Sequence, residues 1–149
     1  MKKIVIENKK AYKDFEIYET YEAGIVLKGS EVKSVRMGNV DLTGSYCKIK
    51  QGEIFVYNMK IAPYEKSFEK LPPDRERKLL LKKKEIKRLT GKVSERGFTI
   101  IPLKIYFNER GWAKLEIAVC KGRKKREKKQ KLKEKEIMRE IERAMKKWR

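Results

Sequence analysis

The chain has 149 residues and a formal net charge of +20, with 41 Lys or Arg, 21 Asp or Glu and no histidine. This length suits one domain with an appendage, and so large a positive excess predicts a polyanionic partner, nucleic acid ahead of an anionic membrane. Lack of histidine excludes Ser-His and Cys-His catalysis and disfavours a structural zinc site, while the short apolar run near the N-terminus predicts neither signal peptide nor membrane span.

We therefore expect a cytoplasmic, membrane-independent protein with no cofactor or metal site. On composition alone, enzymes built on carboxylates or lysine stay possible. Cys47 and Cys120 are interpreted as reduced, small apolar residues. Upstream of residue 121 most of the chain alternates between apolar and polar residues, which is typical of strands.

The first predicted helix lies in GSEVKSVRMG. Ser30 is the expected N-cap, Glu31 suits the positive end of the helix, and Gly38 can end it. Val32 and Val35 share one face, so we predict a helix of about two turns that packs through these valines.

A hairpin is predicted next, where SYCKIK and EIFVYNMKI flank a Gln-Gly turn. Alternation with period two places Cys47 and Ile49 on the same face as Phe55, Tyr57 and Met59. This shared face is the expected core side of the hairpin.

PPDRERKLLLKKKEIKRLTG holds the next two elements. Propensity alone favours one helix from Asp74 to Thr90, yet the apolar triplet in RKLLL fits a strand equally well. We predict a strand followed by a shorter helix from about Lys83 to Gly91, with Ile86 and Leu89 on one face.

The second hairpin turns between Asn108 and Gly111. Its alternation separates a core face from a wettable face. The core set is Leu103, Ile105, Phe107, Ala113, Leu115, Ile117 and Val119, and the wettable set is Lys104, Tyr106, Lys114 and Glu116. These elements together predict a mainly β fold with short helices, an antiparallel barrel of the oligonucleotide-binding (OB) type over residues 1–120.

Residues 121–149 are expected to form a basic tail, because they hold 15 Lys or Arg against 5 Asp or Glu. The first part is almost all charge and should be disordered in isolation. Further on, Ile137, Ile141 and Trp148 belong to an apolar series at helical spacing. Two interpretations stay open: a terminal helix that docks on the barrel, and a segment that becomes helical only in an anionic groove.

Three stretches carry a family resemblance: NKKAYKDFEIYETYEAGIVLKGSEVKSVRMG, RKLLLKKKEIKRLTGKV and PLKIYFNERGWAKLEIAVCKGRKK, in order over residues 8–129. They resemble the successive motifs of the SmpB family. The resemblance implies an OB-type barrel without catalysis that binds the tRNA-like domain of transfer-messenger RNA, the SsrA RNA, and delivers it to stalled ribosomes for trans-translation.

The same resemblance implies that the tail occupies the vacant decoding site and mRNA channel, so that the nascent peptide is tagged and the ribosome rescued. The implied partners are transfer-messenger RNA, the ribosome with its 16S rRNA decoding site, and the elongation factor that carries aminoacyl-tRNA.

The resemblance also implies RNA-binding residues. A carboxylate at Glu22 can accept hydrogen bonds from guanine N1 and N2 or cytosine N4, although a surface ion pair with a lysine is the alternative. Gly24 allows close approach of backbone to RNA or merely a bulge. Leu80 fits core packing equally well, and Asn8 fits a cap or turn. The full set is Asn8, Glu22, Gly24, Leu80, Lys114, Lys121, Gly122 and Lys124.

A second set is implied for the decoding site and tail: Tyr12, Lys13, Glu127, Lys128, Lys129, Ile137, Ile141 and Trp148. This set departs from the family pattern. Lys13 replaces a frequent histidine, so phosphate attraction or the ring of Tyr12 must replace its stacking. Glu-Lys-Lys at 127–129 replaces Asp-Lys-Arg and lacks the planar fork of arginine, and Lys82 stands where His or Asn is usual.

Three other functions stay open. A generic OB-fold binder of single-stranded RNA would present an exposed aromatic row. A ribosomal protein that binds rRNA would carry the same charge. An RNA-cleaving enzyme would need clustered carboxylates, whereas the acids here are scattered.

Overall fold

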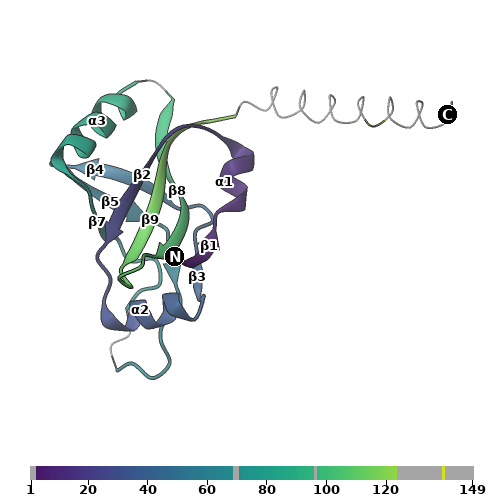
Figure 1. Cartoon of the computed structure of the whole chain (residues 1–149), viewed down its shortest axis with the longest axis vertical. Helices are drawn as coiled ribbons and strands as arrows, with labels where there is room; N and C mark the ends of the chain where they lie inside the picture. Colours follow the sequence, from purple (N-terminus) through teal and green to yellow (C-terminus); the bar gives the residue numbers. More distant parts are fainter. Residues whose placement is uncertain (1–2, 69–70, 96, 124–138, 140–149) are drawn as a thin grey trace.

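Strands dominate the computed structural model, which describes residues 3–68, 71–95, 97–123 and 139 (Figure 1). The described strands are β1 (Lys3–Glu7), β2 (Phe15–Ile25), β3 (Val40–Asp41), β4 (Tyr46–Lys50), β5 (Glu53–Tyr57), β6 (Lys60–Ile61), β7 (Arg77–Leu80), β8 (Phe98–Phe107) and β9 (Ala113–Gly122). The described helices are α1 (Lys9–Asp14), α2 (Gly29–Arg36) and α3 (Lys83–Val93). The prediction of a mainly β fold with short helices is confirmed.

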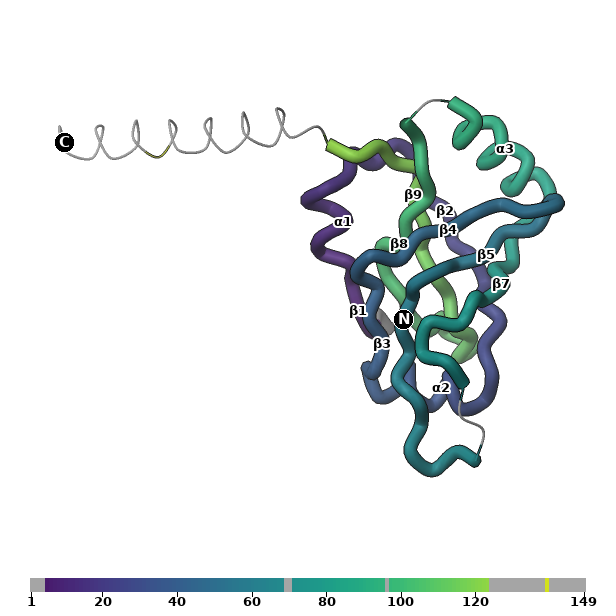
Figure 2. The backbone as a smooth tube through the Cα atoms, turned by 180° about the vertical axis from the view of Figure 1, so that it is seen from behind, coloured from purple at the N-terminus to yellow at the C-terminus, as the bar shows by residue number. Residues whose placement is uncertain are grey.

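Seven strands form one antiparallel sheet in the order β1-β8-β4-β5-β7-β2-β9, and β9 also pairs with β8. β2 and β9 run along the side that faces the reader in Figure 1, whereas β4 and β5 cover the opposite side in Figure 2. β3 and β6 form a separate two-stranded sheet. Helix α2 lies at one end of this curled sheet, and α1 and α3 lie toward the other end.

The main core fills the inside of the curled sheet. Helix α2 contributes Val35 and helix α3 contributes Leu89, both fully buried. A smaller cluster lies under α1 and consists of Ala11, Ile101, Leu103, Ala118 and Cys120. Both cysteines are buried and unbonded to each other, and burial raises the pKa of the Cys120 thiol to about 12. None of the helices in the described ranges has the length and apolar composition that a membrane span requires.

The first hairpin, β4–β5, forms where it was predicted, but the core face predicted for β5 is wrong. Gln51 and Gly52 both have positive φ, 51° and 76°, and make a two-residue turn. This turn places Val56 opposite Cys47, so that Phe55 and Tyr57 point to the outer face. The side chains that fill the core are Ile54, Val56 and Met59.

The second hairpin, β8–β9, departs from strict alternation at two places. A register shift between Pro102 and Lys104 turns Leu103 toward α1 instead of the main core. Tyr106, predicted on the wettable face, is only 2% exposed. Its hydroxyl donates to Glu22 on β2, so its ring lies across β9, which separates the two strands.

The two predicted helices form close to their expected bounds. Helix α2 is capped at Lys28 rather than at Ser30, because the Glu31 carboxylate accepts a hydrogen bond of 2.9 Å from the Lys28 N–H. Gly38, with φ of 78°, follows its end. Strand β7 precedes α3, as predicted; α3 begins at Lys83 and ends at Val93, past the predicted end.

A buried ion-pair network ties α2 to β7 and to the loop before it. Glu31 accepts hydrogen bonds from Arg75 Nη2 at 2.5 Å and from Arg77 Nε at 2.7 Å. Arg77 is itself fully buried, and its Nη1 donates to the Met59 carbonyl at 2.7 Å. Burial by itself raises the pKa of Glu31, but hydrogen bonds from the two arginines and the Lys28 N–H outweigh it and hold the pKa below its usual value.

We expect Glu31→Gln to lower the free energy of unfolding by about 3 kcal/mol or more at neutral pH, since removing one partner of a buried pair leaves charge uncompensated. The folded pKa of Glu31 is lower than the unfolded value near 4.5. The contribution of Glu31 to the free energy of unfolding is therefore fully present above the unfolded pKa. It is lost as the pH falls through the folded pKa. Urea unfolding at about pH 7 and about pH 3 measures both effects.

The control is Glu53→Gln. Glu53 pairs with Lys78 at 3.1 Å, but the two side chains are 52% and 43% exposed. Its removal should cost less than about 1 kcal/mol. Equal losses in the two variants would contradict a stabilising role for the buried network.

Candidate nucleic-acid interface

Glu22 lies on the exposed outer face of β2, near one end of the ladder with β9. Its carboxylate accepts a hydrogen bond from the Tyr106 hydroxyl. Burial raises the pKa of Tyr106, and the bond to Glu22 raises it further, so the phenol keeps its proton at neutral pH and continues to donate. Tyr106 therefore orients the one acidic side chain of the EAG motif.

Gly24 is paired with Leu80 of β7 on one side and with Lys114 of β9 on the other. The three predicted RNA-binding residues thus lie next to one another on neighbouring strands. A Cβ built on Gly24 would lie 3.2 Å from the Leu80 Cβ. The closeness of the two strands, rather than a bulge, favours glycine here.

A shallow groove of about 670 Å³ opens over this point. Leu80 is 54% exposed and Trp112, at the end of the β8–β9 turn, is 66% exposed. We call the depression lined by Gly24, Leu80, Arg110, Trp112 and Lys114 the Leu80 groove. It combines apolar and aromatic surface with two cations, a combination suited to a base or ribose with its phosphate.

Asn8 has a structural role in this fold. It is 4% exposed, and its Nδ2 donates to the carbonyls of Leu42 at 3.2 Å and Pro102 at 3.0 Å. Its Oδ1 accepts from the Ala11 N–H at 3.3 Å and caps α1. This helix was not predicted. The capping alternative for Asn8 holds, and its RNA contact stays a prediction.

Tyr12 and Lys13 are exposed on α1. The end of this helix is joined to the end of β9, because the Arg123 N–H donates to the Asp14 carbonyl at 2.8 Å. Gly122 is the strand partner of Phe15 directly after the helix. The point at which the basic tail begins is thus fixed beside α1.

Lys121 lies at this same end of β9, with its Nζ 4.6 Å from the centroid of the Phe98 ring. It is separated from Lys114 by about 23 Å of extended strand. The predicted RNA-binding residues therefore do not form one cluster. Glu22, Gly24, Leu80 and Lys114 lie at one end of the β2–β9 ladder, and Lys121 and Gly122 lie at the other. The predicted residues Lys124, Glu127, Lys128, Lys129, Ile137, Ile141 and Trp148 lie outside the described residues.

Comparison with known proteins decides the family. A family model described as SmpB protein matches residues 5–147. The chain belongs to the SmpB family. It is 52% identical over 139 residues to an SsrA-binding protein of Thermus thermophilus, covering 93% of this chain and 96% of the relative. It is 53% identical over 145 residues to one of Thermosipho melanesiensis, covering 97% and 99%.

Among solved structures, a chain from "tmRNA-SmpB: a journey to the center of the bacterial ribosome" is similar, with a TM-score of 0.69 and 55% sequence identity. The match covers 80% of this SmpB-family chain and 85% of that one. At this identity the likeness extends to sequence as well as to fold.

Two residues of this family member's candidate interface were missed as site residues. Tyr106 was placed on a wettable face, and nothing in the sequence pairs it with Glu22, which lies 84 positions away. Trp112 follows the turn directly and precedes β9, which begins at Ala113. An aromatic residue at that position is a usable signal, because exposure there is expected from the turn itself.

We expect Gly24→Ala to destabilise the protein by about 1–3 kcal/mol, because the added methyl group meets a Cβ that cannot rotate away. Denaturant unfolding measures the loss. The matched control is Gly91→Ala in α3, where a Cβ meets nothing within 4 Å; it should stabilise the helix by about 0.5–1 kcal/mol. A neutral Gly24→Ala variant would contradict the close packing of β2 on β7.

Proposed function

We propose that this protein binds the tRNA-like domain of transfer-messenger RNA and delivers it to stalled ribosomes for trans-translation. The observation that carries the proposal is the pairing of Glu22 with Tyr106 beside the Leu80 groove. In a chain of net charge +20, such an oriented carboxylate is not needed to attract RNA. It is suited to read a base.

Family membership supports the same function. The relatives are SsrA-binding proteins, and the similar solved chain comes from work on tmRNA, SmpB and the bacterial ribosome. We infer that the protein acts without catalysis, in the cytoplasm, and that its further partners are the 16S rRNA decoding site and the elongation factor that carries aminoacyl-tRNA.

We infer further that the sheet is an OB-type barrel. The strand pairings support this, because they run from β8 through β4, β5, β7, β2 and β9 and return to β8. A closed sheet removes the exposed strand edges that would otherwise pair with other chains. It also provides a rigid body on which an RNA elbow can rest.

The chemistry of the first contact follows from the donor and acceptor inventory. An ionised carboxylate only accepts hydrogen bonds, so Glu22 selects the N–H groups of guanine or cytosine in an unpaired region. Leu80 and Trp112 supply apolar surface next to it, and Lys114 supplies a cation for phosphate. Gly24 carries no side chain that would cover Leu80 where RNA approaches.

The second contact lies at the other end of β9. Tyr12 and Lys13 of α1 flank the start of the basic tail, which supports a shared role toward the ribosome. The barrel and the tail then bind two different RNAs. In this proposal residues 1–120 recognise folded RNA and residues 121–149 enter the decoding site and the mRNA channel.

We expect Glu22→Ala to weaken binding of the isolated tRNA-like domain by about 1–3 kcal/mol, because it removes a base contact. The slope of log K against log salt should hardly change, since no phosphate contact is lost. Gel shifts at two salt concentrations measure both quantities. Tyr106→Phe should cause a smaller loss, because it removes only the orienting hydrogen bond.

The control for this experiment is Glu53→Ala, an exposed acid on β5, which should bind as the unmodified protein does. Competition with an unstructured RNA strand separates this function from generic single-strand binding. Preference for the unstructured strand, or full binding by Glu22→Ala, would contradict the proposed reading of a tRNA-like RNA.

We expect a chain that lacks residues 123–149 to retain most of its binding to the tRNA-like domain while losing peptide tagging on stalled ribosomes. The reason is that the two contacts reside in different parts of the chain. Gel shift and a tagging assay measure the two losses separately. Equal loss in both assays would contradict this division.

A further inference from the structure

An aromatic pair lies at the rim of the sheet beside α3, away from the Leu80 groove. Tyr18 stands at a bulge in β2, where the register with β9 shifts between Ile17 and Glu19. The side chain of Tyr18 is 50% exposed. Its ring meets that of Phe98 edge to face, with centroids 5.0 Å apart and an interplanar angle of 72°. A bulge turns a side chain out of the regular ladder. Tyr18 therefore points outward, and the Phe98 ring packs against it.

Lys121 adds a positive charge to this pair. It is the strand partner of Phe98 on β9, and its ammonium group lies over the Phe98 ring. The cation is thereby held next to the braced tyrosine by a cation–π contact. We call Tyr18, Phe98 and Lys121 the exit cluster, because β9 leaves the sheet one residue later at Gly122.

The charges around the exit cluster nearly balance within the folded part. Glu19 accepts from the Tyr21 hydroxyl at 2.7 Å and from Arg88 of α3 at 2.8 Å, so its charge is compensated. Glu16 stands opposite Lys121 on β2. The positive excess comes from the chain that follows, because residues 121–149 carry 15 Lys or Arg against 5 Asp or Glu. Because the rest of this segment follows Gly122 directly, it raises the local concentration of RNA near the exit cluster.

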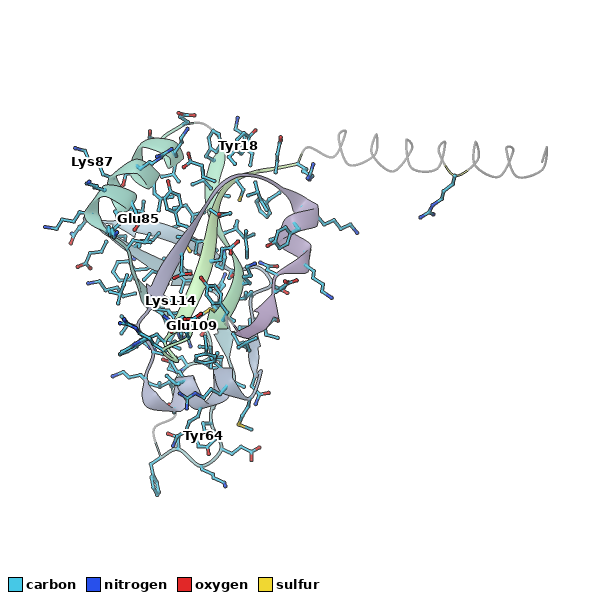
Figure 3. All side chains as sticks on the ribbon, viewed as in Figure 1. Tyr18, Tyr64, Glu85, Lys87, Glu109 and Lys114 are labelled. Atoms are coloured by element: carbon cyan, nitrogen blue, oxygen red, sulfur yellow. The ribbon has the colours of Figure 1, made fainter. Side chains whose placement is uncertain are left out.

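We propose that the exit cluster binds one unpaired nucleotide of a single-stranded RNA, with its base stacked on Tyr18 and its phosphate beside Lys121. Any base presents a π-face, so such a site accepts RNA without reading its sequence. Figure 3 shows Tyr18 and Lys114 far apart along the sheet. The site is therefore separate from the Leu80 groove, and it extends the proposed function by naming a contact for the second RNA on the folded part of the chain.

Fluorescence anisotropy with a short labelled oligouridine and the full-length protein tests this. Tyr18→Leu should weaken binding about 5- to 100-fold, the effect of losing one base stack. Tyr18→Phe keeps the ring and should bind within about twofold of the unmodified protein. Lys121→Gln should lower the salt slope by about one, whereas Tyr18→Leu should leave the slope unchanged. Equal binding by Tyr18→Leu and the unmodified protein overturns the proposal.

A second measurement uses only the unmodified protein, so it tests the proposal even where Tyr18→Leu fails to fold. An oligouridine that contains 4-thiouridine, irradiated on the unmodified full-length chain, should crosslink to peptides that contain Tyr18 or Phe98. Crosslinks only elsewhere overturn the proposal. Binding of the tRNA-like domain should be unchanged in Tyr18→Leu, and an equal loss there also overturns a separate site. If the unmodified protein fails to bind the tRNA-like domain, the proposed function is wrong. The proposal for the exit cluster is then decided separately, by the oligouridine experiments.

Discussion

The ladder between β2 and β9 is the constraint on which both proposed contact regions depend. It runs from Phe15 opposite Gly122 to Gly24 opposite Lys114. Neither strand can slide along the other, because a shift of one residue would turn every side chain of the strand to the opposite face. The two ends of the ladder therefore keep a fixed separation. A protein that must hold two RNAs at a set separation needs such a spacer, and hydrogen-bonded strands provide it without a hinge. The bulge at Tyr18 shifts the register with β9 by one residue between Ile17 and Glu19, and the pairing is regular on either side of it.

Acidic residues in this strongly basic chain differ in what holds them. Glu31 is buried against two arginines and ties α2 to β7, so its charge serves the fold. Glu19 is compensated at the surface by Arg88. The hydrogen bond from Tyr106 orients Glu22 without adding a positive charge to it. In the proposed function, this orientation suits Glu22 to accept hydrogen bonds from a base.

Local signals in the sequence were enough for the two hairpins, for α2 and for the strand and helix around Lys83, but not for α1 or for the faces that the strands present. The strand-to-helix break before Lys83 follows from the apolar triplet and was predicted. The core face of β5 failed because it depends on the two-residue turn at Gln51, which sets the register. The burial of Tyr106 and Asn8 was not predicted, for a different reason. Each is buried by partners far away in the chain, Glu22 for one and Leu42 with Pro102 for the other, and single-sequence periodicity carries no information on such pairs.

The hydrogen bond between Arg123 and Asp14 fixes where the basic segment starts, which its charge alone does not do. A polycation on a free end attracts RNA from any direction. Here Arg123, directly after β9, is hydrogen-bonded to Asp14 at the end of α1, so the segment starts close to Tyr12 and to the exit cluster. Contacts that are weak as separate events then become intramolecular and gain from a high effective concentration. In the proposed function, one stacked base and one exposed helix would thus set the direction in which the segment enters a ribosomal groove.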